Sequence, residues 1–192
     1  MGDPLDGAPR RLLVRDGRFT PELRHSVAFF VLGEVALTGH RLRIERAHSE
    51  GVFAIGWGRA PETRVTLTEV AVLGTKRAPC AELPASSPWS CLAQSGQHPV
   101  GGTGVAATEG ARIGLDGFRI AGSELAGMLV ASGGLVSARR GIITENALGV
   151  NVMDPDYDPS TLQADVEIHG NGADVARLVV PVPEVGVLLG TR

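Results

Sequence analysis

Short stretches in which apolar and polar residues alternate recur along this chain at intervals of roughly 22 to 25 residues. Each repeat joins such a stretch to a polar turn and then to a glycine that opens the next stretch. The best-preserved repeat is carried by two sets with the same spacing: Ile143, Asn146 and Val150, then Ile168, Asn171 and Val175. Alternation with a period of two is typical of half-buried strands, and a fixed repeat of this length is typical of a solenoid.

The candidate strands fall into three sets, which predicts three short strands in each turn of the solenoid. The first set is residues 35–37, 65–67, 113–115 and 135–137; the second is 42–44, 70–72 and 118–120; the third is 52–54, 105–107, 128–130 and 150–152. One turn cannot bury its inner face alone, but stacked turns pair each strand with its equivalents and join the inner faces into one core. The pattern therefore predicts an all-β parallel β-helix.

Glycine and asparagine mark the turns between these strands. We predict that the glycines opening the third set adopt positive φ, because a residue without Cβ tolerates a sharp turn there; they are Gly51, Gly104, Gly127 and Gly149. Asn146 and Asn171 occupy matching turn positions, and Asn also tolerates the left-handed region. Their side chains could hydrogen-bond along the solenoid, although the pattern first indicates turn residues.

Insertions and the two ends interrupt the repeat. The solenoid is expected over residues 35–176, with residues 1–34 as a cap or an incomplete rung and residues 177–192 as an edge strand or cap. The largest insertion, residues 76–102, is rich in Pro, Ser and Ala, and shorter ones span residues 57–62 and 154–160. Insertions in repeat proteins map to surface loops and often form the binding face.

Composition limits the classes of partner. The chain has 192 residues, a formal net charge of -3, 26 Gly and 4% aromatic residues, which suits a narrow core of small and branched side chains. It contains neither a basic stripe nor a nucleic-acid-binding motif, so we expect no nucleic-acid partner. The sequence also lacks an apolar run long enough to suggest a membrane span.

The two cysteines and the amino-terminal residues point to different compartments. Residues 1–17 contain no apolar segment typical of a secretory signal, which taken literally indicates the cytoplasm. Cys80 and Cys91 both lie in the large insertion, where a disulfide would fit an exported or cell-surface protein whose recorded start is incomplete. Two ordinary thiols are the alternative, and a metal site without nearby histidines is a third.

The repeated Gly-Val-x-Val strands and the Ile-x-x-Asn-x-x-x-Val phrase resemble the right-handed parallel β-helix proteins of the pectate-lyase-like superfamily. The resemblance covers roughly residues 35–176. Within the superfamily, the chain is most similar to uncharacterised exported bacterial members in which a cysteine-bearing loop interrupts the solenoid. It implies a right-handed solenoid. The superfamily includes polysaccharide lyases, hydrolases, epimerases, phage tailspikes and non-catalytic surface proteins, so the resemblance alone does not assign an activity.

Candidate chemistry is concentrated in the inserted loops and on one strand position. Asp154, Asp156 and Asp158 form the best acidic cluster, and they first indicate a solvated acidic turn and no cofactor. The alternative is that these alternate carboxylates bind Ca²⁺, although the glycine and distal glutamate of a calcium loop are missing. Further candidate ligand contacts are two outward arginines, which could meet uronate carboxylates, and three loop aromatic residues, which could stack on sugars: Arg43 and Arg119, then Trp57, Trp89 and Tyr157.

These observations favour a non-catalytic, secreted or surface β-helix protein that presents loops for binding or adhesion, to a polysaccharide or a surface protein. The alternative is a carbohydrate-active enzyme, or a degenerate relative of one, acting on acidic polysaccharide. A third hypothesis is that the chain is a fragment of a longer solenoid. The sequence leaves an enzymatic activity open and favours its absence, because the strand positions present no coherent set of paired carboxylates.

Overall fold

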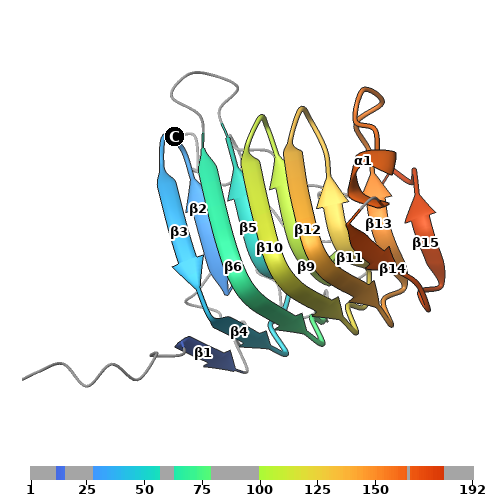
Figure 1. Ribbon diagram of the computed structural model, residues 1–192, viewed down its shortest axis with the longest axis horizontal. Coiled ribbons are helices and arrows are strands. Elements are labelled where there is room, and N and C mark those ends of the chain that lie inside the picture. The colour runs from blue at the N-terminus through green and yellow to red at the C-terminus, as the bar shows by residue number, and fades with distance from the viewer. Residues whose placement is uncertain (1–11, 16–27, 57–62, 79–99, 164, 180–192) are drawn as a thin grey trace, which may run out of the picture.

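The computed structural model describes residues 12–15, 28–56, 63–78, 100–163 and 165–179, and these form a parallel β-solenoid of about five turns, each of about 25 residues (Figure 1). The predicted fold class is therefore confirmed. One helical turn, α1 (Ser160–Gln163), is the only helix among these residues.

Two parallel sheets wrap the core. The long-strand sheet contains β1 (Leu12–Arg15), β3 (Ala36–His40), β4 (Leu42–Glu45), β6 (Arg64–Leu73), β10 (Arg112–Ala121), β12 (Leu135–Thr144) and β14 (Val166–Ile168). The short-strand sheet has the order β15-β13-β11-β9-β5-β2, with bounds β2 (Phe29–Leu32), β5 (Glu50–Ile55), β9 (Thr103–Thr108), β11 (Ala126–Val130), β13 (Leu148–Val152) and β15 (Ala173–Ala176). A short antiparallel pair, β7 (Arg77–Ala78) and β8 (Val100–Gly101), closes the base of the large insertion.

In β6, β10 and β12 the first and second predicted strand sets are the two halves of one long strand; only in the first turn are they separate strands, β3 and β4. In β6, β10 and β12 the chain bends at one residue of positive φ and then continues in the same sheet; these residues are Glu69, Gly117 and Arg140, with Arg41 between β3 and β4 in the same row. Figure 1 shows the resulting curvature of these strands. The bend could not be predicted from the sequence, because three of the four residues in this row are charged residues, which do not signal positive φ, rather than glycine.

The strand register confirms the second and third sets and corrects the first. Ile44, Val72, Ile120, Ile143 and Ile168 form one inward row, and Val52, Val105, Met128, Val150 and Val175 form another. In the first set, however, Leu37 rather than Val35 pairs with Val65, and Val136 rather than Leu135 pairs with Ile113. Val35 and Leu135 are exposed, so burial rather than mere alternation decides the register.

The glycines that open the third set are needed for space, and the prediction that they adopt positive φ was wrong. None of the four is among the described residues with positive φ. A Cβ at Gly127 would lie 2.8 Å from both the Gly149 carbonyl oxygen and Ile143 Cγ2, and Gly51, Gly104 and Gly149 meet equivalent obstacles. The turn itself is made earlier by another row: Arg46, Gly74, Gly122, Glu145 and Gly170.

Asn146 and Asn171 form a short ladder inside this corner. Asn146 Nδ2 donates to Asn171 Oδ1 at 3.0 Å, and Asn146 Oδ1 accepts from the Ser123 backbone N–H at 2.9 Å. Neither Asn has positive φ, so their role is not the left-handed turn that the sequence suggested. The amides instead satisfy backbone groups of neighbouring turns where the chain leaves the ladder of the sheet.

Strands also occur near both ends of the described chain. In the predicted amino-terminal segment, β1 pairs with β4, and β2 pairs with β5. Beyond β15, the Asn151 side chain accepts from the Leu178 backbone N–H and donates to the Leu178 carbonyl, each at 2.9 Å. No helix in the described part of the chain is long and apolar enough to cross a membrane.

Candidate functional site

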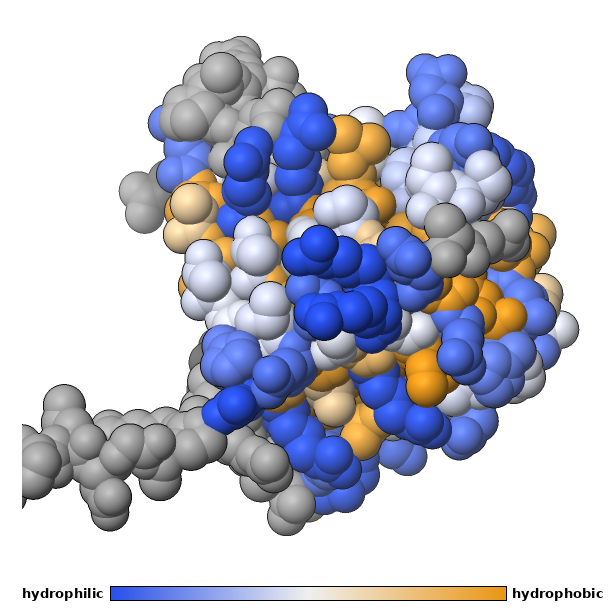
Figure 2. Space-filling view, in the orientation of Figure 1, coloured by the Kyte–Doolittle hydropathy of each residue, from blue (hydrophilic) through white to orange (hydrophobic). Residues whose placement is uncertain are grey.

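A groove crosses the outer face of the long-strand sheet. Its first hollow has a volume of about 630 Å³ and is bounded by β6, β10, β12 and the loop that precedes α1. Figure 2 shows this face, which is hollowed in its upper part between hydrophilic side chains and carries some hydrophobic surface there. The groove forms where the outer face of the long strands meets a loop that stands above them.

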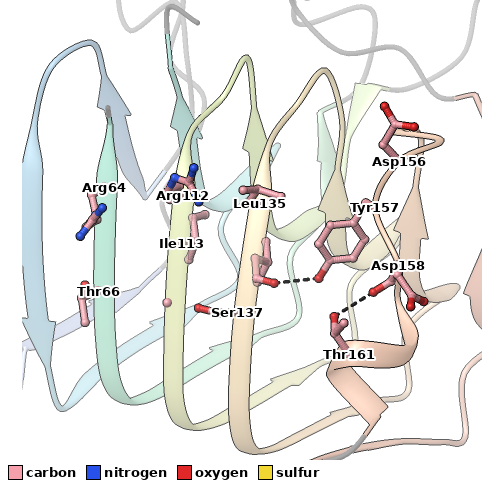
Figure 3. A pocket seen from close by; sticks show the side chains of 12 residues that line it. Arg64, Thr66, Arg112, Ile113, Leu135, Ser137, Asp156, Tyr157, Asp158 and Thr161 are labelled. Atoms are coloured by element: carbon pink, nitrogen blue, oxygen red, sulfur yellow. Dashed lines mark hydrogen bonds between the residues drawn. The ribbon is translucent and has the colours of Figure 1, made fainter. Parts of the chain in front are cut away.

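The floor of this hollow consists of small side chains in one row of the sheet. Thr66, Gly114 and Ser137 are paired neighbours on β6, β10 and β12 and point outward, because Val65, Ile113 and Val136 before them are buried in the core. Arg64 and Arg112 stand one row away at the strand starts (Figure 3). Two hydroxyl groups therefore flank a position with no side chain, with guanidinium groups at the rim.

The opposite wall is the loop containing Asp154, Asp156 and Asp158, which reaches the groove as Figure 3 shows for the last two. Asp158 caps α1: its carboxylate accepts from the Ser160 backbone N–H at 2.9 Å and from Ser160 Oγ at 2.8 Å. Hydrogen bonds from the Ser160 backbone and side chain hold the pKa of Asp158 below its usual range. This carboxylate therefore stays ionised at neutral pH.

Tyr157 anchors the loop to the sheet. Its hydroxyl donates to the Val136 carbonyl oxygen at 2.7 Å, and the residue is only 7% exposed within the core cluster. Burial raises the pKa of Tyr157 to about 12. Little of this ring is open to stack on a sugar, so its placement gives it a structural part in fixing the wall.

Two further hollows extend the groove along the strands. The second, of about 410 Å³, shares Thr66, Gly114 and Ser137 with the first, and the third, of about 520 Å³, shares Asp165 with the second. We call the three hollows together the furrow. It follows the long strands across their bend.

A charge cluster lies in the middle of the furrow. Asp116 contacts both Arg139, at 2.9 Å, and Arg140, at 2.6 Å. Arg140 has φ of 54°, so these consecutive arginines both reach the same carboxylate from the next strand. The hydrogen bond from Arg140 is the main reason why the pKa of Asp116 is lowered. The consecutive arginines at a strand centre are the signal that sequence analysis missed.

The two outward arginines that the sequence singled out lie in one row, but each faces an acidic side chain. Arg43 and Arg119 occupy the same row, separated by Ala71 on β6. Arg43 Nε lies 2.5 Å from Glu45 Oε1, and an Arg119 guanidinium nitrogen lies 3.4 Å from Glu145 Oε1. Arg119 lines the third hollow, whereas Arg43 does not line any of the three.

The candidate calcium ligands do not converge. Asp154 Oδ2 accepts from the Gly133 backbone N–H at 2.6 Å, and its Oδ1 accepts from the Asp156 backbone N–H at 2.9 Å, which leaves these oxygens engaged in loop closure. In the described ranges, no group of three or more His, Cys, Asp or Glu side chains is arranged to hold a metal ion. Four predicted residues, Trp57, Trp89, Cys80 and Cys91, lie outside the described residues.

Among the described residues, the one carboxyl group whose pKa is clearly raised lies outside the furrow. Glu50 opens β5 in the short-strand sheet and is 4% exposed; its burial raises its pKa to about 8, although the Ser49 hydroxyl donates to it at 2.5 Å. It does not line the furrow.

Comparison of the chain with protein-family models, with curated proteins and with solved structures gave no match in any of the three.

Proposed function

We propose that this solenoid is a non-catalytic binding protein that holds a stretch of uncharged polysaccharide in the furrow. The observation that carries the proposal is the hollow of about 630 Å³, whose floor offers hydroxyl groups and whose rim offers arginine and aspartate side chains. Polysaccharides present hydroxyl groups along an extended chain, and such a chain matches an elongated surface lined with both donors and acceptors.

The charges along the furrow favour an uncharged ligand over an acidic one. In the first hollow, Arg64 and Arg112 are offset by Asp156 and Asp158. The other two hollows contain more acidic than basic side chains: Asp116, Asp165 and Arg139 line the second, and Glu69, Asp165, Glu167, Arg119 and Arg140 line the third. A polymer with a carboxylate on each sugar would meet balanced or negative surroundings, and the like charges would repel it.

Two of the furrow carboxylates, Asp116 and Asp158, are in a state that suits binding rather than glycoside cleavage. Glycosidases need one carboxylic acid that keeps its proton near neutral pH to protonate the leaving oxygen. The lowered pKa values of Asp116 and Asp158 leave both ionised, and both carboxylates are engaged with neighbouring groups. The carboxyl suited by its pKa to donate a proton, Glu50, is buried in the other sheet.

The solenoid fold is consistent with the resemblance to right-handed parallel β-helix proteins of the pectate-lyase-like superfamily, and we include that relationship in the proposal. Proteins with this fold include both enzymes and non-catalytic surface proteins, so the fold alone supports either activity. The charges and carboxylates of the furrow described above favour a non-catalytic binding protein over an enzyme.

The test is a thermal melt of the protein with dextran, laminarin, mannan and xylan as neutral polymers and with polygalacturonate and alginate as acidic ones. A ligand that binds the folded state raises the Tm by mass action. We expect a rise with at least one neutral polymer and a smaller one with the acidic polymers. No rise with any polymer would refute the function, and a rise with acidic polymers alone would refute the charge argument.

Two variants locate the binding to the furrow. Ser137→Ile fills the floor of the first hollow with a side chain that suits a strand. Thr38→Ile is the matched control, because Thr38 pairs with Thr66 in the same row but does not line any of the three hollows. Loss of the Tm shift in the first variant and its retention in the second would place the ligand in the furrow.

A further inference from the structure

Gly114 differs from every other glycine in the described part of the chain. Each of the others either has positive φ or would place a Cβ within 3.0 Å of another atom. At Gly114 the backbone is ordinary strand, and the nearest atoms to an added Cβ are Ser137 Oγ at 3.7 Å and the Val65 carbonyl oxygen at 3.9 Å, which are ordinary contacts. Neither backbone conformation nor packing therefore requires glycine here.

A glycine in the interior of a strand has a cost. It gains more conformational freedom on unfolding than other residues, and it offers no side chain to pack against cross-strand neighbours. Gly114 lies in the central strand of the three that form the groove floor, with Arg112 and Asp116 as the outward residues on either side of it. A β-branched residue at this site would suit the strand better.

The absence of a side chain at Gly114 leaves open space in the floor of the hollow. The residue lines both the first and the second hollow, midway between Thr66 and Ser137. The strand register places Thr66 and Ser137 on either side of it, and Figure 3 shows these two side chains with Arg112, which also belongs to β10, between and above them. Any larger outward side chain at this position would fill the space that the two hollows share.

We propose that Gly114 is the contact point of the bound polysaccharide: one sugar ring lies against the exposed backbone of β10, between the hydroxyl groups of Thr66 and Ser137. This assignment rests on the function proposed above and adds the residue that sets how closely the ligand approaches. A glycine in a strand is a recurring feature of sites where a ligand comes close to the backbone. The flanking hydroxyl groups can each donate to, or accept from, hydroxyl groups at the edges of the ring.

The experiment uses a series of substitutions of increasing volume, Gly114→Ala, Gly114→Thr and Gly114→Leu, with Thr38→Leu as the control in the same row. For each variant the Tm without ligand and the Kd for the best neutral polymer of the panel are measured. We expect the Tm to stay level or rise along the series, most clearly for Gly114→Thr, while the affinity falls roughly tenfold or more for Gly114→Leu. The control should keep the wild-type affinity.

Each outcome decides between defined alternatives. A fall in Tm along the series would mean that glycine is required by the fold, and an unchanged Kd for Gly114→Leu would mean that the ligand binds elsewhere; either result overturns the assignment while leaving the binding function intact. If no neutral polymer binds the wild-type protein, the proposed function itself fails. An independent readout is the Gly114 amide resonance, which should shift on addition of the polymer that binds.

Discussion

Replacing Glu50 with glutamine should stabilise the protein at neutral pH. The Glu50 carboxyl is buried at the start of β5, and the Ser49 hydroxyl donates to it, but burial dominates and raises its pKa from 4.5 to about 8. The folded protein therefore holds this proton at pH 7, whereas the unfolded chain has released it. Because the pKa is raised on folding, unfolding becomes more favourable as the pH rises through the window between 4.5 and about 8.

The size of the effect follows from the two pKa values. Each pH unit between them costs about 1.4 kcal/mol of the free energy of unfolding. Between the unfolded pKa of 4.5 and pH 7 the penalty reaches about 3 kcal/mol. For a domain of this size that corresponds to roughly 6 to 12 °C in Tm. Glutamine keeps the shape and the oxygen that accepts from Ser49, but it cannot ionise, so Glu50→Gln should recover most of the penalty.

The assay is urea unfolding of the wild type and of Glu50→Gln at half-unit steps from pH 4.5 to 8. The two curves should nearly coincide at the acidic end, and the advantage of the variant should grow with pH. Glu145→Gln removes an exposed glutamate and controls for the loss of one negative charge. A stability difference that stays constant with pH, or that reverses, would refute the assignment of a protonated carboxyl at this site.

Three further predictions concern the corner of the solenoid and the wall of the furrow. Gly127→Ala should destabilise the protein by about 2–3 kcal/mol, because its Cβ meets a carbonyl oxygen and Ile143 at 2.8 Å. Gly122→Ala, with φ of 71° but ordinary contacts, should cost about 1 kcal/mol. Urea unfolding that ranks the two variants in the opposite order would contradict the argument that Gly127 is needed for space. Asn146→Ala should cost about 2 kcal/mol, since it leaves the buried Ser123 N–H without its acceptor, and hydrogen exchange at Ser123 should accelerate. Tyr157→Phe should cost about 1 kcal/mol in thermal unfolding and weaken polymer binding by loosening the wall, while equal binding by this variant would separate the loop from the site.

The sequence predicted the solenoid because its inward positions are repeated strictly. Ile143 and Ile168, or Val150 and Val175, face a narrow core that accepts only apolar side chains of similar size, and the pairing register follows from them. No comparable pattern in the sequence marks the bend of the long strands. Glu69 and Arg140 adopt positive φ although neither is a residue type that signals it, so two halves of one strand were taken for two strands.

The furrow was harder to predict because its residues are far apart in the sequence and individually ordinary. Thr66, Gly114 and Ser137 are unremarkable outward positions until the register places them side by side, and Tyr157 brings a loop above them. The spacing of Asp154, Asp156 and Asp158 suggested calcium, but local backbone hydrogen bonds use several of their oxygens. Gly114 could have been found only by asking which glycines the fold does not need.

Because of the asparagine ladder, the amino-terminal and carboxy-terminal turns of the solenoid should differ in how easily they separate from their neighbours during unfolding. In the corner row that contains it, the residues in order of the turns are Ala47, Thr75, Ser123, Asn146 and Asn171, and side-chain amides join adjacent turns only from Ser123 onward. Ala47 has no polar side chain, and among the described residues the buried hydroxyl of Thr75 has no partner. In a linear stack each turn is held by its neighbours, so the weaker steps lie at the amino-terminal end. Under tension or denaturant the rod should therefore peel from its amino-terminal turns, while the last three turns come apart as a unit.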